Sequence, residues 1–273
     1  MDRHPITFIG GGNMARSLIG GLIARGHAPE ALRVAEPVEA LREALASDFG
    51  VRVRATGVEA AAGAGTWLLA VKPQVMRSVC ESLAPLAQAQ RPLLVSIAAG
   101  ITTAQIDQWL GGDQAVVRSM PNTPALLGAG ATGLFANGRV SLAQRKAAET
   151  LMQAAGITAW IPDEGLMDAV TAVSGSGPAY AFLLAEAMQA AGVAQGLAPE
   201  TARVLVLQTL LGAARMLSES GEPAAVLRQR VTSPGGTTQA ALETFEASGF
   251  RQLVDQAIAA ATRRGRELAA GNG

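Results

Sequence analysis

Three small residues at fixed spacing near the N-terminus constrain the fold of this chain more than any other feature. Gly10, Gly12 and Ala15 follow the apolar run Ile6–Ile9 and open a segment with helical apolar spacing, Ala15–Arg25. The first position permits a tight turn, the second lets the backbone approach a pyrophosphate, and the third allows close contact between helix and strand. Glycines alone indicate only a flexible turn, but between a strand and a helix they predict a dinucleotide-binding turn.

Strand-like and helix-like segments alternate over the first 161 residues. This alternation favours parallel strands joined by right-handed crossovers. The expected strands are Ile6–Ile9, Leu32–Ala35, Val51–Val53, Trp67–Val71, Pro92–Ser96, Ala115–Arg118, Ala131–Phe135 and Thr158–Ile161. We therefore expect an α/β fold whose N-terminal part is a doubly wound, Rossmann-type parallel sheet.

After Pro162 the pattern becomes helical, with prolines near the expected helix starts and glycines near the expected ends. The expected helices are Glu164–Ser174, Ala179–Ala191, Pro199–Ser218, Pro223–Val231, Thr237–Glu246 and Phe250–Leu268. The sequence thus predicts a dinucleotide-binding domain over residues 1–161 and an all-helical domain over residues 162–273.

The composition excludes several classes of function. The 22 basic and 22 acidic residues leave no excess positive charge to release counterions from nucleic acid. A single cysteine, Cys80, excludes an internal disulfide and a cysteine-based zinc site, and fits a reducing cytoplasm. No apolar stretch approaches the roughly 20 residues that a membrane helix needs. The two histidines, His4 and His27, are expected to be exposed rather than catalytic, and we expect no metal.

Glu36 stands about twenty residues after the glycine turn, at the end of the second expected strand. An acidic side chain there accepts a hydrogen bond from a ribose 2′-hydroxyl and repels a 2′-phosphate, which favours NAD. The alternative interpretation is a solvated glutamate before a helix that starts at Pro37. Because Arg33 and Arg42 are near in sequence, the choice between NADH and NADPH stays open.

Three later strand ends are expected to join the same crevice. They are Ala70–Pro73, Ser96–Gly100 and Arg118–Pro124, each rich in glycine, proline or small residues. Ligands of open α/β sheets bind at the carboxyl ends of the strands. Lys72 is therefore interpreted as a cofactor-edge residue, against the alternative of a plain surface charge.

A second loop, Val231–Thr238, runs into the helix expected from Thr237. Its successive backbone N–H groups and small hydroxyls form an anion site suited to a carboxylate. A helix start capped by a Pro-Gly turn explains the same residues equally well, so the chemistry of the loop leaves both readings open.

Four motifs together resemble the pyrroline-5-carboxylate reductase family: Ala70–Pro73, Met120–Pro124, Ser174–Tyr180 and Ser233–Thr238. They occur in the family's order over nearly the whole chain. The resemblance implies reduction of L-Δ1-pyrroline-5-carboxylate to L-proline by NADPH or NADH, the last step of proline biosynthesis. It also implies that the helical domain binds substrate and forms a homodimer, and that dimers assemble further, often to decamers.

The resemblance also assigns roles to individual residues. It places the substrate carboxylate on Ser233, Gly235, Gly236, Thr237 and Thr238, with Thr238 also near the ring nitrogen. It places Thr171 and Ser176 in the same pocket, with Glu164 at its border. The segments that match the cofactor contacts are Gly10, Gly11, Gly12, Asn13 and Met14, then Glu36 and Pro37, then Ala70, Val71 and Lys72, and finally Ala98, Ala99 and Gly100.

The distribution of acids and bases fits imine reduction. No lysine occurs after Lys146, whereas a 3-hydroxyacid dehydrogenase of similar build would use a lysine in its helical domain. A protonated C=N bond is already electrophilic, so positioning supplies much of the effect. The hydroxyls of Thr171 and Thr238 are the catalytic candidates, with Thr171 a weak proton donor. The alternatives are another imine or 2-oxoacid reductase, or a dinucleotide sensor without turnover.

Overall fold

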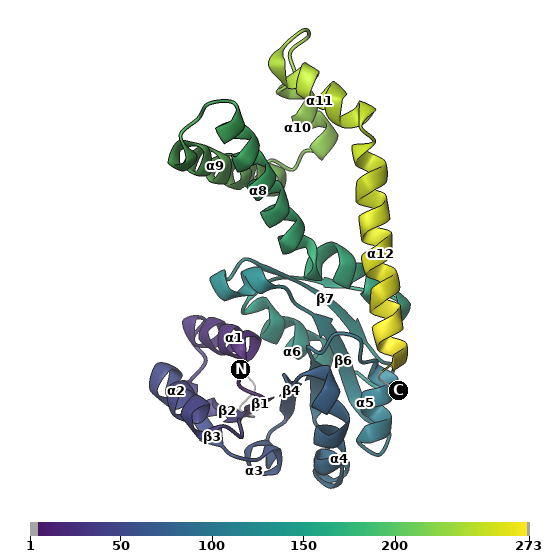
Figure 1. Ribbon diagram of the computed structural model, residues 1–273. Coiled ribbons are helices and arrows are strands. Elements are labelled where there is room, and N and C mark those ends of the chain that lie inside the picture. The colour runs from purple at the N-terminus through teal and green to yellow at the C-terminus, as the bar shows by residue number, and fades with distance from the viewer. Residues whose placement is uncertain (1–4, 272–273) are drawn as a thin grey trace. The chain divides into compact units, whose positions relative to one another are not determined.

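The computed structural model describes residues 5–271, so His4 lies outside the described part. By its contacts the chain forms two compact units (Figure 1): unit 1 is Met1–Ser176 with Ala260–Gly273, and unit 2 is Gly177–Ala259. Every described element after Trp160 is helical. The first division between the two units lies after Ser176 and not after residue 161. The domain boundary at 161/162 therefore stays a prediction.

Unit 1 is built on an eight-stranded sheet with the order β3-β2-β1-β4-β5-β6-β7-β8. The strands are β1 (Ile6–Ile9), β2 (Leu32–Ala35), β3 (Arg52–Arg54), β4 (Thr66–Leu69), β5 (Leu93–Ser96), β6 (Ala115–Met120), β7 (Gly130–Ala136) and β8 (Gly156–Trp160). The eight expected strands are confirmed: β1 and β2 have the expected bounds, and the others differ by one or two residues at one or both ends. The doubly wound order, which runs outward from β1 in both directions, is confirmed as well.

One strand pair departs from the expected parallel pattern. β6 and β7 are antiparallel, with Val117 opposite Ala136, whereas β7 and β8 are again parallel. Only residues 121–129, with the short 3-10 helix η2 (Thr123–Leu127), connect β6 to β7. A parallel crossover needs about a dozen residues or more, so this connection is too short to return the chain to the starting edge of the sheet.

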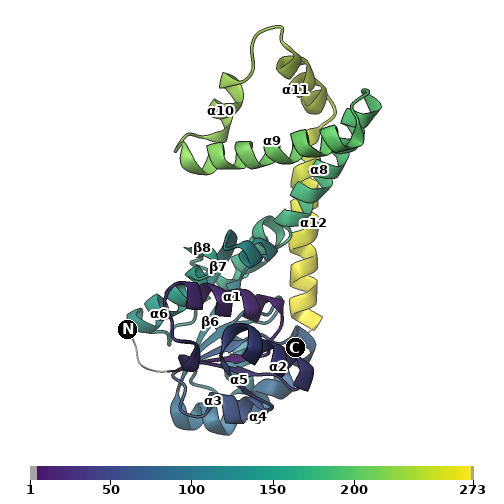
Figure 2. The ribbon, with the colours of Figure 1, turned by 90° about the vertical axis from the view of Figure 1, so that its left-hand side faces the viewer.

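Helices cover both faces of the sheet (Figures 1 and 2). One buried core joins the sheet to α1 (Asn13–Ala24), α2 (Glu39–Phe49) and α6 (Leu142–Gln153). A second core, on the other face, joins it to α3 (Gly57–Ala61), α4 (Pro73–Gln90) and α5 (Thr103–Trp109). The central strands β1, β4, β5 and β6 are largely buried, as their near-continuous apolar sequences require, whereas the edge strands β3 and β8 are partly exposed.

The remaining elements are helical. Unit 1 ends with the short helices η3 (Glu164–Leu166), α7 (Met167–Val170) and η4 (Thr171–Gly175), the last of which has π-helical geometry; η1 (Pro29–Ala31) precedes β2. Unit 2 holds α8 (Gly177–Ala194), α9 (Pro199–Glu219), α10 (Ala224–Arg230) and α11 (Thr237–Ala247). The last helix, α12 (Phe250–Gly271), belongs to unit 2 up to Ala259 and to unit 1 from Ala260.

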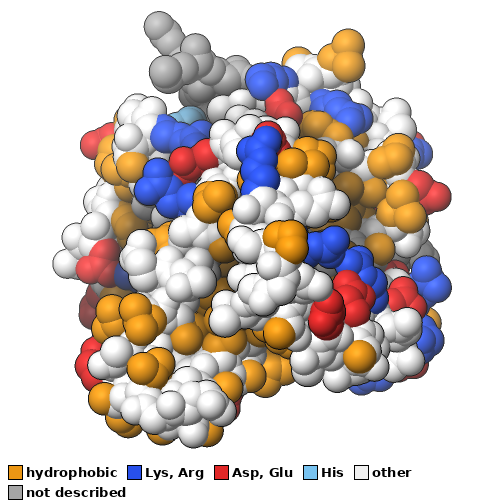
Figure 3. Space-filling view, turned by 90° about the horizontal axis from the view of Figure 1, so that it is seen from above, with side chains coloured by type: hydrophobic (Ala, Val, Ile, Leu, Met, Phe, Trp, Pro, Cys, Tyr) orange, Lys and Arg blue, Asp and Glu red, His pale blue; other side chains and the backbone are white. Residues whose placement is uncertain are grey.

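Unit 2 buries few of its own side chains. Only Ala185 is buried in α8, and only Ala202 and Val206 are buried in α9. Large apolar side chains are open to solvent instead, including Phe182 at 67% and Leu183 at 66% exposure. Figure 3 shows such side chains between charged groups on the face seen from above. Apolar surface of this kind marks an interaction site.

Two sequence expectations concern the surface. His27 is half-buried in the turn after α1, so it is less exposed than expected. None of the described helices is both long and apolar enough to cross a membrane.

Close packing of α1 against the end of α6 gives a stability prediction. A Cβ atom at Gly21 would overlap the backbone carbonyl of Ala154, which cannot move aside like a side chain. Gly21→Ala should therefore lower the free energy of unfolding by about 1–3 kcal/mol, as measured by denaturant titration.

Gly20→Ala is the matched control on the same helix. A Cβ there would meet only the ring of Phe49, at 3.4 Å. Alanine should raise helix stability by about 0.5–1 kcal/mol at that position. Equal stability of Gly21→Ala and wild type would contradict the packing described.

Candidate active site

The glycine turn between β1 and α1 fits against neighbouring backbone. Gly10 has a φ of +103°, and a Cβ on it would lie 2.7 Å from the carbonyl oxygen of Ala70. Its N–H donates to the carbonyl of Ala35 at 2.9 Å. Gly10 therefore lies between the ends of β2 and β4, where no larger residue fits.

The N-terminus of α1 is open to a ligand. Gly12 is the N-cap residue, and no side chain in the described chain accepts from the first turn of this helix. A Cβ on Gly12 would have no described atom within 4 Å, and Gly12 and Asn13 are exposed. A helix start with free N–H groups and space in front of it suits a phosphate group. The turn thus fits the pyrophosphate of a dinucleotide.

Glu36 is buried and fixes the turn. Its Oε2 accepts from the Gly11 N–H at 3.1 Å and its Oε1 from the Val38 N–H at 3.0 Å. The side chain is therefore not the solvated glutamate of the alternative interpretation, because it is only 7% exposed.

Two arginines near Glu36 in sequence left NADPH as an alternative cofactor, and both bind backbone carbonyls. Arg42 donates to the Pro37 carbonyl at 2.7 Å, and Arg33 donates to the Ala62 carbonyl at 2.6 Å. Both guanidinium groups are thus held by backbone carbonyls, whereas the carboxylate of Glu36 contacts the glycine turn directly.

The later strand ends lie at the same edge of the sheet. β4 pairs with β1, and β5 pairs with β4, all in parallel, so Ala70 and Ile97 follow adjacent strand ends. Lys72 is exposed at the N-cap of α4, while Ala98 is buried. The structure therefore brings together the expected cofactor segments Gly10–Met14, Glu36–Pro37, Ala70–Lys72 and Ala98–Gly100.

Glu164 is engaged in a buried charge cluster. Its carboxylate accepts from the backbone N–H of Thr103 at 2.7 Å and from the Thr103 hydroxyl at 2.8 Å. Arg118 lies between Glu164 and Asp168, at 3.5 and 3.6 Å, with its side chain only 6% exposed. Neither Arg118 nor Asp168 was predicted from the sequence as a site residue. Arg118 stands in an otherwise apolar strand, and a charge buried there requires a partner of opposite charge. This position could have indicated a buried ion pair.

Thr171 begins the π-helical turn η4. Its hydroxyl donates to the carbonyl of Met167 at 2.9 Å, and its own carbonyl accepts from the N–H of Ser176 at 2.8 Å. A hydroxyl has one proton, so in this conformation Thr171 presents lone pairs to a ligand rather than a proton.

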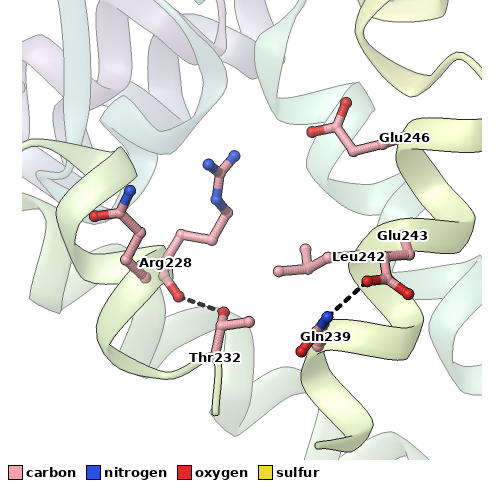
Figure 4. Close-up of a pocket in the computed structure, with 7 residues that line it drawn as sticks. Arg228, Thr232, Gln239, Leu242, Glu243 and Glu246 are labelled. Atoms are coloured by element: carbon pink, nitrogen blue, oxygen red, sulfur yellow. Dashed lines mark hydrogen bonds between the residues drawn. The ribbon is translucent and has the colours of Figure 1, made fainter. Parts of the chain in front are cut away.

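The loop before α11 is partly closed by its own side chains. The N–H of Gly235 donates to Oε1 of Gln239 at 2.7 Å, and the N–H of Gly236 donates to the carbonyl of Ser233 at 3.0 Å. Gln239 in turn donates to Glu243 at 2.7 Å (Figure 4). Two of the N–H groups expected to bind a carboxylate are thus already satisfied.

The N-terminus of α11 remains available. Its N-cap is Gly236, which makes no side-chain cap hydrogen bond, although the Pro-Gly turn of the alternative interpretation does precede it. The backbone N–H groups of Thr237 and Thr238 belong to this uncapped first turn, and both residues also carry a hydroxyl. This end of α11 therefore fits an anion.

A hollow of about 370 Å³ lies next to this loop, between α10 and α11. Figure 4 shows the Arg228 guanidinium pointing into it from α10, with the Glu246 carboxylate on the α11 side. Both signs of charge line the hollow, and all of its walls belong to unit 2.

Two further kinds of reactive group were sought in the described part of the chain, metal-binding clusters and an activated thiol. Over residues 5–271 no group of three histidine, cysteine or acidic residues is arranged to hold a metal ion. Burial raises the pKa of the Cys80 thiol to about 12, with a smaller contribution from the Glu81 carboxylate. A thiol that stays protonated and buried is a poor nucleophile.

Two family models match parts of the chain. Residues 164–268 match the model described as pyrroline-5-carboxylate reductase dimerisation. Residues 5–100 match the model described as NADP oxidoreductase, coenzyme F420-dependent.

Relatives match over nearly the full length. A pyrroline-5-carboxylate reductase from Pseudomonas aeruginosa is 53% identical over 98% of each chain. The structure of a pyrroline-5-carboxylate reductase from Coxiella burnetii has a TM-score of 0.95 at 43% identity, covering 98% of this chain and 99% of that one. A Plasmodium falciparum pyrroline carboxylate reductase with NADP bound has a TM-score of 0.85 at 30% identity, with 98% and 99% covered.

The buried charge cluster gives a stability prediction. Arg118→Met leaves the carboxylates of Glu164 and Asp168 without their cation, and breaking a buried ion pair from one side is strongly destabilising. The free energy of unfolding should fall by about 3 kcal/mol in a denaturant titration.

Arg139→Met is the matched control. Arg139 also lies between two carboxylates, those of Asp107 and Asp113, but its side chain is 49% exposed. Its loss should lower the free energy of unfolding far less than Arg118→Met does, because water screens an exposed ion pair. Equal costs at the two arginines would contradict the importance given to burial.

Proposed function

The chain belongs to the pyrroline-5-carboxylate reductase family, and we propose that the carboxyl edge of its sheet binds the cofactor and that the first turn of α11 binds the substrate carboxylate. The enzyme is an oxidoreductase that reduces L-Δ1-pyrroline-5-carboxylate to L-proline with NADPH or NADH, the last step of proline biosynthesis. The observation that carries the proposed site is the uncapped N-terminus of α11, which offers N–H groups and hydroxyls to a carboxylate.

The cofactor is proposed to bind along the strand ends. The α1 N-terminus, with Gly10–Met14, receives the pyrophosphate, and Glu36 with Pro37 borders the ribose. Ala70–Lys72 and Ala98–Gly100 border the rest of the cofactor. Glu36 supports a preference for NADH, because its buried carboxylate would repel a 2′-phosphate and the nearby arginines are bound to carbonyls.

The substrate carboxylate is proposed to bind at the N-terminus of α11. Thr237 and Thr238 contribute backbone N–H groups and hydroxyls, and Ser233 contributes its hydroxyl. Gly235 and Gly236 keep the loop in its turn through the contacts to Gln239 and Ser233. Direct donation from the Gly235 N–H to a substrate requires Gln239 to move away, since one N–H makes one strong hydrogen bond.

The reduction requires a hydride at the imine carbon and a protonated nitrogen. When bound, the nicotinamide supplies the hydride. Thr171 is proposed to orient the nitrogen: its oxygen accepts from a protonated imine, whereas donation requires it first to leave the Met167 carbonyl. Thr238 lies near the same nitrogen and Ser176 contacts the ring. Glu164 borders the substrate while its carboxylate stays with Thr103 and Arg118.

The chain assembles with copies of itself. We propose that the helices of unit 2 form the dimer and that dimers assemble into decamers. The exposed Phe182, Leu183 and Leu253 support a partner, because these apolar side chains find none within the described chain. A cytoplasmic location is also proposed, in line with a single reduced thiol and a nicotinamide-dependent biosynthetic step.

Two substitutions test the assigned hydroxyls. Thr171→Val and Thr238→Ala each remove an oxygen that contacts the substrate, so kcat/KM for pyrroline-5-carboxylate should fall roughly tenfold or more. The rates are followed by the loss of NAD(P)H absorbance.

Thr244→Ala is the control on the same helix as Thr238. The Thr244 hydroxyl donates to the Ala240 carbonyl one turn back and is exposed, so its loss should leave the rate unchanged. Wild-type turnover in both Thr171→Val and Thr238→Ala would refute the assignment.

A further inference from the structure

The carbonyl of Ser174 lacks its usual helical donor. In an α-helix this carbonyl would accept from the N–H of residue 178, which is a proline and has none. The side chain of Asn122 takes that place: its Nδ2 donates to the Ser174 carbonyl at 3.1 Å. Asn122 thus satisfies a carbonyl that Pro178 cannot serve.

Asn122 holds a second element with its other amide atom. Its Oδ1 accepts from the backbone N–H of Ala131 at 2.9 Å, at the start of β7. The Ser174 hydroxyl donates to the carbonyl of Ala131 at 3.3 Å and closes the ring. Three hydrogen bonds therefore join the end of β6, the start of β7 and the turn η4.

Close packing reinforces this ring. A Cβ on Gly175 would lie 2.7 Å from the methyl carbon of Met120, and a Cβ on Gly133 would lie 2.5 Å from Val170. The turn η4 therefore packs against β6 through Gly175, and Val170, directly before the turn, packs against β7. Contact limits its distance from the sheet, and the hydrogen bonds of Asn122 fix its position along the strands.

We propose that Asn122 is a positioning residue for the reduction. It holds Thr171–Gly175 in the π-helical register, in which the Ser176 N–H donates to the Thr171 carbonyl. Thr171, which begins this turn, and Ser176, its C-cap residue, are thereby aimed at the substrate. The inference rests on the proposed function, which gives these two residues their substrate contacts.

Asparagine is specifically suited to this place. It offers a donor and an acceptor on one planar group, and the two partners here need one of each. Aspartate has the same shape and keeps the bond from Ala131, but it loses the donor to Ser174 and puts a negative oxygen beside a carbonyl. Asn122→Asp therefore removes the one hydrogen bond that the inference depends on.

The test compares substrate kinetics with cofactor binding in Asn122→Asp. We expect kcat/KM for pyrroline-5-carboxylate to fall on the order of tenfold to a hundredfold, as for a displaced catalytic group. The dissociation constant of NADH, from fluorescence titration without substrate, should change much less than kcat/KM, since the pyrophosphate turn is untouched and both amide atoms of Asn122 are already bonded to Ser174 and Ala131.

Asn137→Asp is the matched control. Asn137 makes the same kind of bridge at the other end of the β6–β7 pair: its Nδ2 donates to the Gln114 carbonyl at 3.0 Å, and its Oδ1 accepts from the Val116 N–H at 3.2 Å. The substitution should cost similar stability but leave kcat/KM within about twofold of wild type. A purely structural role for Asn122 predicts that the two variants behave alike.

The outcomes separate this inference from the proposed function. Asn122→Asp with wild-type kcat/KM, or Asn137→Asp with an equal loss, overturns the positioning role. Wild-type turnover in both Thr171→Val and Thr238→Ala overturns the proposed substrate contacts instead, whatever Asn122→Asp does. If Asn122→Asp does not fold, Asn122→Ser replaces it, since its short hydroxyl cannot span both partners.

Discussion

Parallel pairing of β1 with β2 and β4 is the constraint on which the site depends. It brings the end of each strand to one edge of the sheet, so residues separated by tens of positions in sequence meet there. The absence of a side chain at Gly10 is what allows this edge to close, because the Ala70 carbonyl occupies the space that a Cβ would need. The open N-terminus of α1 follows directly from that turn.

Local signals predicted much of this arrangement. The Gly10 turn, the eight strand positions and the acidic residue at the end of β2 all depend on neighbours in sequence, and the structure contains each of them. The antiparallel β7 was missed because a strand's direction is set by the length of its connection and by its pairing, not by its own apolar pattern. The predicted strand bounds differ from the observed ones by at most two residues.

Long-range polar contacts could not be predicted in the same way. Arg118 and Glu164 are 46 positions apart, and neither sequence neighbourhood indicates the other. The two motifs Met120–Pro124 and Ser174–Tyr180 were recognised separately, yet Asn122 of one completes the hydrogen bonding of Ser174 in the other. The two motifs form a hydrogen bond with each other, and only the folded structure shows that they are neighbours. Likewise, the contact of Gln239 with Gly235 depends on a side-chain conformation that spacing does not determine.

The structure and its relatives agree that this chain reduces a cyclic imine acid with a nicotinamide cofactor. The decisive experiment measures initial rates with pyrroline-5-carboxylate, pyrroline-2-carboxylate and simple 2-oxoacids, each with NADH and with NADPH. We expect rapid oxidation of the cofactor with pyrroline-5-carboxylate, formation of L-proline, and the higher kcat/KM with NADH. Cofactor oxidation with a 2-oxoacid or pyrroline-2-carboxylate but not with pyrroline-5-carboxylate, or tight cofactor binding without any turnover, would contradict the account.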